Sequence, residues 1–153
     1  MQEEIAISSQ APMIRLLGMA FDAFAAELGE RVSAAGYADI RPGHGCVFGN
    51  IDPESGSRLT ELAERANMTK QSVGEVTSDL EQRGYLERVA DPSDGRAKII
   101  RLTQQGREAY LMGRRLIDEL ERDWAERYGE ERLAALREAL EAVTAERLGA
   151  LPA

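Results

Sequence analysis

Apolar side chains recur at helical spacing near both ends of this chain. From Met13 to Val32 they step by three and four residues, at Ile14, Leu17, Phe21, Phe24 and Leu28. After a break at Gly129 the same spacing returns, at Leu133, Leu136, Leu140 and Val143. Such a narrow apolar seam is typical of one helix packing on another. The pattern therefore predicts long outer helices that need apolar partners.

The middle of the chain predicts two short helices joined by a tight turn. The first carries its apolar face on Leu59, Leu62, Ala63 and Ala66, and the second on Val73, Val76 and Leu80. Thr69 is placed to cap the start of the second helix. Gly84 lies where a glycine with positive φ would end it. A short helix is expected over 44–51, and Ser57, after the turn-forming DPESGS, is a candidate N-cap for the first helix.

A β-hairpin is predicted directly after these helices. The segments LERV and AKIIRL are β-prone and flank a connection of five residues, Asp91 to Gly95. After Thr103 the chain becomes helical again, with one apolar side formed by Leu116, Ile117, Leu120 and Trp124.

The order of elements predicts a mainly α fold with a small β-hairpin wing, a winged helix-turn-helix with outer dimerisation helices. We expect one domain over 1–153, with dimerisation helices in 12–35 and 104–150 and the DNA-binding lobe in 44–103. A core this small has few inner surfaces to receive the outer seams. A second copy of the chain can bury these apolar seams, so the sequence predicts a homodimer.

Charge and composition narrow the function. The 153 residues carry 19 Lys plus Arg against 27 Asp plus Glu, a net charge of −8, which argues against loose binding of polyanions over the whole surface. From Arg65 to Arg101, however, seven cations face six anions. No apolar run is long enough to span a bilayer, and the start lacks the basic residues of a signal peptide. With a single cysteine, these features predict a cytoplasmic protein with no membrane association.

The chemistry of the second helix suits base recognition. In a winged helix-turn-helix this helix enters the major groove of DNA. Gln71 can pair with adenine, Lys70 can reach guanine or a phosphate, and Glu75 can accept a hydrogen bond from cytosine. Gly74 costs about 1 kcal/mol relative to alanine inside a helix. Close approach of DNA or tight helix packing would each explain that glycine.

The stretch LTELAERANMTKQSVGEVTSDLEQRGYLERVADPSDGRAKIIRLTQQG resembles the MarR (multiple-antibiotic-resistance regulator) family of transcription factors. Its most specific part is the wing motif, in which Asp94 and Arg96 precede Leu102, Thr103 and Gly106. The resemblance implies a homodimeric regulator, commonly a repressor, whose terminal helices dimerise. It also implies that Arg96 enters the minor groove, braced by a charge-assisted hydrogen bond that its guanidinium donates to Asp94. The family often binds small aromatic or anionic effectors between its dimerisation helices and its DNA-binding lobe.

Two sets of site residues follow, with no cofactor or metal among the expected partners. The expected DNA-binding residues are Thr69, Lys70, Gln71, Ser72, Glu75, Ser78, Asp94, Arg96 and Lys98. Lys98 and Arg101 fit solvated strand charges as well as phosphate contacts. The effector candidates, which mix apolar surface with a few polar groups, are Arg15, Met19, Tyr37, His44 and Trp124.

Three other functions remain open from the residues alone. A winged helix can serve as a protein-interaction module without binding DNA. Cys46 and His44, two positions apart, also suggest a cysteine-based redox sensor or a small enzyme. A buried structural cysteine is the ordinary explanation of Cys46. One histidine and one cysteine do not complete a zinc site without several carboxylates.

Overall fold

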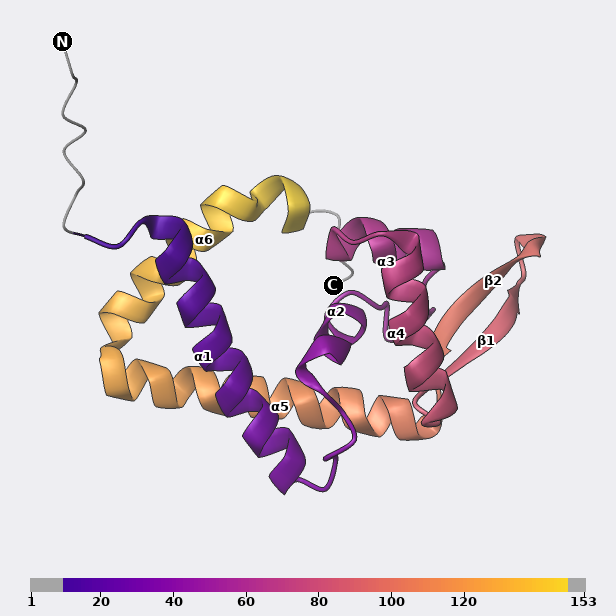
Figure 1. Cartoon of the computed structure of the whole chain (residues 1–153), viewed down its shortest axis with the longest axis horizontal. Coiled ribbons are helices and arrows are strands. Elements are labelled where there is room, and N and C mark those ends of the chain that lie inside the picture. The colour runs from indigo at the N-terminus through magenta and orange to yellow at the C-terminus, as the bar shows by residue number, and fades with distance from the viewer. Residues whose placement is uncertain (1–9, 149–153) are drawn as a thin grey trace, which may run out of the picture.

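Helices dominate the chain, and a single antiparallel hairpin is the sheet of the described part, which confirms the predicted fold class. The computed structural model describes residues 10–148 (Figure 1). Residues 1–9 and 149–153, the two ends of the predicted domain, lie outside the described residues. The N-terminal segment that was predicted not to be a signal peptide falls mostly within 1–9. The elements are α1 (Met13–Ala34), η1 (Pro42–His44), α2 (Gly45–Phe48), α3 (Leu59–Ala66), α4 (Lys70–Gln82), β1 (Leu86–Asp91), β2 (Asp94–Leu102), α5 (Gln104–Tyr128) and α6 (Glu130–Leu148).

The long helix α5 joins two parts of the molecule. Figure 1 shows α1 and α6 beside one half of α5, whereas α2, α3, α4 and the hairpin gather near its N-terminal end. The latter group, the winged-helix lobe, encloses one apolar core. Each aliphatic side chain buried there contributes about 1.5–3 kcal/mol. The core residues are Val47, Ile51, Leu62, Ala63, Val73, Leu80, Tyr85, Leu86, Ile100, Leu102 and Ala109.

The buried face of α4 differs slightly from the predicted stripe. Val73 and Leu80 are buried as predicted, but Val76 is only half-buried. Thr77 takes the third buried position, where its hydroxyl donates a hydrogen bond to the carbonyl oxygen of Gly74 at 3.0 Å. Both ends of α4 form as predicted. The N–H of Ser72 donates to Thr69 Oγ1 at 3.1 Å, and Gly84 adopts a φ of +85° just past the C-terminus.

The predicted N-cap role of Ser57 is wrong. Arg58 occupies the cap position of α3, and its N–H donates to the carboxylate of Glu61 at 2.7 Å. Ser57 is instead buried, and its N–H and C=O both pair with Ile100 at 2.9 Å. Its hydroxyl accepts from the Arg65 guanidinium at 3.1 Å. This bridge joins the segment before α3 to β2, so Ser57 ties the hairpin to the helix-turn-helix.

Two predicted boundaries also shift. The segment expected to be one helix over 44–51 forms the 3-10 turn η1 and the short α2. The hairpin connection is shorter than the predicted five residues, because the strands extend to Asp91 and Asp94. The Asp91 carboxylate accepts hydrogen bonds from the N–H and hydroxyl of Ser93, at 2.8 and 2.7 Å, and an irregularity after Ala90 lets the strands stay paired.

The C-terminal half of α1 packs on α5. Phe24 meets Trp124 edge to face at a ring-centre distance of 5.1 Å. The Trp124 indole N–H and the Arg127 guanidinium both donate to Glu27, at 3.2 and 3.0 Å. Arg31 forms an ion pair with Asp123. These contacts fix α1 across α5.

The predicted outer seams stay largely uncovered within one chain. At the N-terminal half of α1, Ile14 is 82% exposed and Phe21 is 73% exposed. On α6, Leu136 and Leu140 are exposed and Val143 is 85% exposed. In the described residues no helix is apolar over a length that would cross a membrane.

At Gly106 the backbone of α5 lies directly against the backbone of Tyr85. A Cβ built there would lie 1.9 Å from the carbonyl oxygen of Tyr85, a distance no relaxed structure tolerates. Gly113, one helical stretch further along α5, has nothing within 4 Å of the same position.

We therefore expect opposite effects from the same substitution in one helix. Gly106→Ala should lower the free energy of unfolding by about 1–3 kcal/mol or more, because α5 must move off Tyr85. Gly113→Ala should raise it by about 0.5–1 kcal/mol through helix propensity. Urea denaturation at one protein concentration, followed by Trp124 fluorescence, measures both. Equal effects of the two variants would contradict the close contact.

Asp91 anchors the wing to α3 and predicts a pH dependence. Its carboxylate is buried, and its pKa falls from 3.8 to about 2, first because Ser93 donates two hydrogen bonds and then because Arg58 donates from Nε at 2.8 Å. A lowered folded-state pKa stabilises the fold above the ordinary value, and this contribution is lost as the pH falls towards 2. The difference in unfolding free energy between wild type and Asp91→Asn should stay constant above a pH of about 5 and shrink below about 4. A difference that persists unchanged in acid would argue against an ionised Asp91 as the anchor.

Candidate nucleic-acid interface

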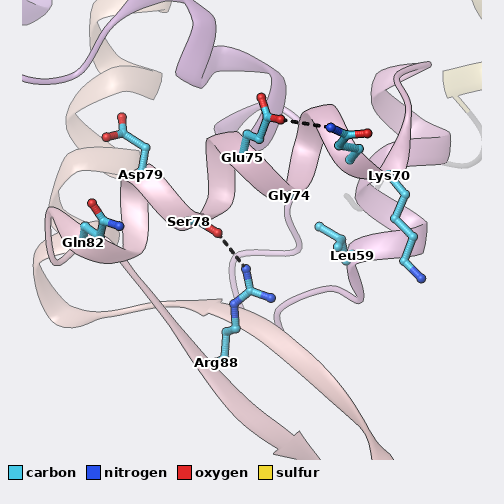
Figure 2. Close-up of a pocket in the computed structure, with 9 residues that line it drawn as sticks. Leu59, Lys70, Gly74, Glu75, Ser78, Asp79, Gln82 and Arg88 are labelled. Atoms are coloured by element: carbon cyan, nitrogen blue, oxygen red, sulfur yellow. Dashed lines mark hydrogen bonds between the residues drawn. The ribbon is translucent and has the colours of Figure 1, made fainter.

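A shallow groove runs between α4, the first residue of α3 and strand β1 (Figure 2). Its volume is about 710 Å³. Polar and charged side chains dominate its walls, which suits a hydrated, charged partner better than an apolar small molecule. The lining residues are Leu59, Lys70, Gln71, Gly74, Glu75, Ser78, Asp79, Gln82 and Arg88.

The helical repeat sorts the α4 side of this groove into two rows. Residues four apart lie on one side of a helix, so Lys70, Gly74, Ser78 and Gln82 form one row. Gln71, Glu75 and Asp79 form the second. The Gln71 amide lies 3.4 Å from a Glu75 carboxylate oxygen, a long hydrogen bond that leaves both groups accessible. The groove thus contains four of the predicted DNA-binding residues, Lys70, Gln71, Glu75 and Ser78.

Thr69 and Ser72, also predicted to contact DNA, form the cap of α4. Thr69 Oγ1 accepts the Ser72 N–H and lies 2.8 Å from the Ser72 hydroxyl. Thr69 is exposed and Ser72 half-buried, so the cap orients two hydroxyl groups at the end of α4. Their structural role is to start α4 in a fixed direction.

Helix packing does not require the glycine at position 74. A Cβ there would meet only Leu59 Cδ2, at 3.8 Å, which is an ordinary van der Waals contact. Tight packing, one of the two explanations drawn from the sequence, is therefore not the reason for Gly74. The open side of this residue faces the groove.

Asp79 and Arg88 line the groove, and sequence analysis did not identify either as a site residue. Asp79 accepts from Arg83 Nε at 2.9 Å and lies 2.8 Å from His44 Nε2. The Arg83 hydrogen bond, followed by that of His44, lowers the pKa of Asp79. Arg88 Nε donates to Glu81 at 2.8 Å, and Nη2 lies 3.3 Å from the Ser78 hydroxyl. Leu59 and Gln82 complete the set that was missed. The alternation of charge along LERV was the one sequence signal that could have pointed to Arg88.

The wing carries the remaining predicted DNA-binding residues on β2. Arg96 and Lys98 are exposed and share the strand face that further on buries Ile100 and Leu102. The predicted brace between Asp94 and the Arg96 guanidinium is not what forms. Asp94 Oδ1 accepts the backbone N–H of Arg96 at 3.1 Å, since an aspartate reaches the amide two residues ahead more easily. Asp94 therefore shapes the backbone at the wing tip.

Electrostatic pairing separates two groups of cations in the lobe. Between Ser57 and Thr103, all of which the structure describes, the side chains of Lys70, Arg96 and Lys98 have no hydrogen-bond or ion-pair partner. Carboxylates hold Arg58, Arg83, Arg88 and Arg101, and Arg65 donates to Asn50 and Ser57. Arg101 is thus tied to Glu87 at 2.7 Å rather than free for phosphate.

The five effector candidates lie in three places, and none of them lines the groove. Arg15 and Met19 are exposed on the N-terminal half of α1, and Trp124 packs between α1 and α5. Tyr37 and His44 belong to the segment between α1 and α2, where the Tyr37 ring is tilted by 43° to the Tyr85 ring, with the ring centres 6.4 Å apart.

His44 and Cys46 have structural partners of their own. The Arg41 N–H donates to His44 Nδ1 at 3.0 Å, so Nε2 carries the proton that is donated to Asp79. The Cys46 thiol donates to the Gly43 carbonyl oxygen at 3.2 Å, and burial raises its pKa. A reactive thiol requires the opposite shift. Among residues 10–148 no group of three or more His, Cys, Asp and Glu side chains is arranged to hold a metal ion.

Comparison with known proteins agrees with this geometry. Residues 38–97 match the model of the MarR family, and the search of curated proteins gave no match. Escherichia coli MarR in its apo form has 21% identity, a TM-score of 0.71 and coverage of 88% of this chain and 98% of that one. CouR from Rhodococcus jostii, bound to p-coumaroyl-CoA, has 22% identity, a TM-score of 0.70 and coverage of 88% and 95%.

A further structure has a comparable likeness. A MarR family protein of Mycobacterium tuberculosis in complex with salicylic acid has 22% identity, a TM-score of 0.68 and coverage of 90% of this chain and 99% of that one. At these identities the solved structures show a shared fold, and the family model covers most of the winged-helix lobe. Residues 38–97 thus match the MarR family, and the chain as a whole has the winged helix-turn-helix fold of the solved MarR structures.

Proposed function

We propose that this protein is a homodimeric transcriptional regulator that binds specific sites in double-stranded DNA. The observation that carries the proposal is the distribution of partnerless cations in the lobe. Lys70 begins the recognition helix and Arg96 and Lys98 lie on the wing, while the other arginines of the lobe are bonded within the chain. An acidic chain has little reason to leave these three unpaired unless an anionic partner meets them.

Each part of the lobe has a defined task in this proposal. With α4 in the major groove, Gln71 and Glu75 face base edges, where amide and carboxylate groups discriminate between bases. Arg96 enters the adjacent minor groove, whose negative potential is greatest where A·T tracts narrow it. Lys98 meets the phosphate backbone, and Thr69, Ser72 and Asp94 hold the contacting segments in shape.

The exposed apolar seams support a second copy as the partner of α1 and α6. We assign dimerisation to the helices in 12–35 and 104–150 and DNA binding to 44–103. Exposed Ile14, Phe21 and Val143 form apolar surface that monomers rarely leave in contact with water. A two-fold dimer would present two recognition helices to a pseudo-palindromic site.

Regulation by a small molecule is the last part of the proposal. Two proteins of the same fold were crystallised with salicylic acid and with p-coumaroyl-CoA, respectively. We infer a repressor in the cytoplasm, released by a small aromatic or anionic effector. Of the five candidate residues, His44 has a direct connection to the groove, through Asp79. A ligand near Tyr37 and His44 could therefore shift α4.

The decisive experiment is selection of bound duplexes from a random pool. A symmetric enriched site would support both sequence-specific binding and the dimer. Enrichment of no sequence, with no binding to duplex DNA at low salt, would replace this proposal with a protein-interaction module.

Arg96→Ala should weaken binding to every duplex, most strongly where A·T-rich sequence flanks the site, and should leave folding unchanged because the side chain has no partner. The slope of log K against log salt should flatten by about one unit if the contact includes a phosphate. Fluorescence anisotropy with flank-altered duplexes measures the effect. The control is Arg101→Ala, a paired arginine on the same strand that we expect to bind like wild type.

Leu136→Glu combined with Leu140→Glu should abolish dimerisation, since each buried aliphatic side chain would contribute about 1.5–3 kcal/mol to the interface. Both side chains are exposed within one chain, so the monomer should keep its helical content. Sedimentation velocity at micromolar concentration checks the prediction. A variant that sediments as the wild-type dimer would remove α6 from the interface.

A further inference from the structure

The position of the groove in the lobe raises a question that base recognition does not answer. It lies on the side of α4 that faces β1 and the first residue of α3 (Figure 2). If α4 occupies the major groove and the wing occupies the adjacent minor groove, one sugar-phosphate strand must pass between them. This inference rests on the proposed DNA-binding function and concerns the course of that strand.

The floor of the groove is apolar and has no side chain at its middle. Gly74 leaves the backbone of α4 bare, and Leu59 Cδ2 is the one heavy atom outside the helix that would touch an added Cβ. An alanine would fit the protein and would favour the helix by about 1 kcal/mol. The glycine therefore leaves room for something outside the chain, and the apolar Leu59 beside it suits the deoxyribose of a nucleotide.

The two ends of the groove carry cations. Lys70 has no partner, and Arg88 is 34% exposed at its side chain. Glu81 holds Arg88 through Nε, and Nη2 lies near Thr77 and Ser78, at 3.4 and 3.3 Å. Nη1 makes no hydrogen bond within the described chain. Figure 2 shows the Arg88 side chain rising from β1 towards Ser78, with Leu59 between Arg88 and Lys70.

The acids of the groove do not cancel these cations. Asp79 is neutralised by Arg83 at 2.9 Å and also bonds His44. Glu75 belongs to the other row of α4 and bonds Gln71. The row nearest the wing presents the cation of Lys70, the bare backbone of Gly74 and the hydroxyl of Ser78.

We propose that this groove seats the sugar-phosphate strand that separates the major groove from the minor groove. Arg88 and the Ser78 hydroxyl hold one phosphate, Lys70 holds a phosphate at the other end, and a deoxyribose lies over Gly74 and Leu59. Contacts of this kind fix the orientation of a protein on DNA and carry no base preference.

The test compares two ion pairs of the hairpin. Replacing Arg88 alone would leave Glu81 unpaired beside DNA, so the variant is Glu81→Gln with Arg88→Gln. The matched control is Glu87→Gln with Arg101→Gln, because it also removes one exposed ion pair and leaves the net charge unchanged. Strand alternation places Glu87 and Arg101 on the opposite face of the hairpin from Arg88.

Binding is measured against the selected site and an unrelated duplex at several salt concentrations. The double variant Glu81→Gln with Arg88→Gln, called the Arg88 variant, should lose affinity by the same factor on both duplexes. Its slope of log K against log salt should flatten by about one unit. The control should behave like wild type. Neutralising single phosphates as methylphosphonates should identify one position per half-site that weakens the wild type but not the Arg88 variant.

Gly74→Ala tests the gap separately. Its melting temperature should equal or exceed that of wild type, and its affinity should fall by the same factor on both duplexes. Wild-type binding by either the Arg88 variant or Gly74→Ala, or a loss confined to one base pair, would overturn the inference. Failure of the wild type to bind any duplex would instead overturn the proposed function.

Discussion

The junction between the lobe and α5 is the constraint on which the rest of the structure depends. The Tyr85 carbonyl accepts the Thr103 N–H at 3.1 Å, and the Thr103 hydroxyl donates to the Gly84 carbonyl and accepts the Gly106 N–H. Gly106 brings α5 against Tyr85 with no side chain between them. Because α5 continues from this joint to its contacts with α1 and α6, the joint sets the orientation of the lobe relative to the helices that carry the exposed seams. In a dimer, that orientation would determine the distance between the two copies of α4.

Electrostatics then divides the lobe into an inner and an outer part. Inside, Arg58 with Asp91 ties the wing to α3, and Arg83 with Asp79 holds the end of α4. Together with the pairs of Arg88 and Arg101, they bind four of the eight cations between Ser57 and Thr103 to carboxylates. The cations that remain unpaired lie at the start of α4 and on the wing. A local positive surface can therefore exist although the molecule as a whole repels polyanions, and such a surface favours binding at defined points over loose association.

The His44–Asp79 hydrogen bond connects the segment behind α4 to the groove in front of it. His44 is buried, and its other ring nitrogen accepts the Arg41 N–H. A movement of the η1 segment would therefore displace the hydrogen-bond partner of Asp79. The same segment includes Cys46, whose raised pKa and bond to Gly43 fit a packing role. The polar groups of this region thus support α4 through the bond between His44 and Asp79.

The sequence by itself determined most of the helices, the hairpin and the row of polar side chains on the exposed side of α4. Periodic apolar positions, the Thr69 cap and Gly84 are local signals, because each acts on backbone a few residues away. The wing motif likewise located Asp94 and Arg96. Only the tertiary structure decided which cations are free, because Arg101 and Arg88 find their carboxylates across the hairpin and on α4. It also placed Ser57 against Ile100, 43 positions further along the chain. In the same way it placed His44 against Asp79, 35 positions further along. No local pattern encodes such pairs, since they form only when the core brings distant segments together.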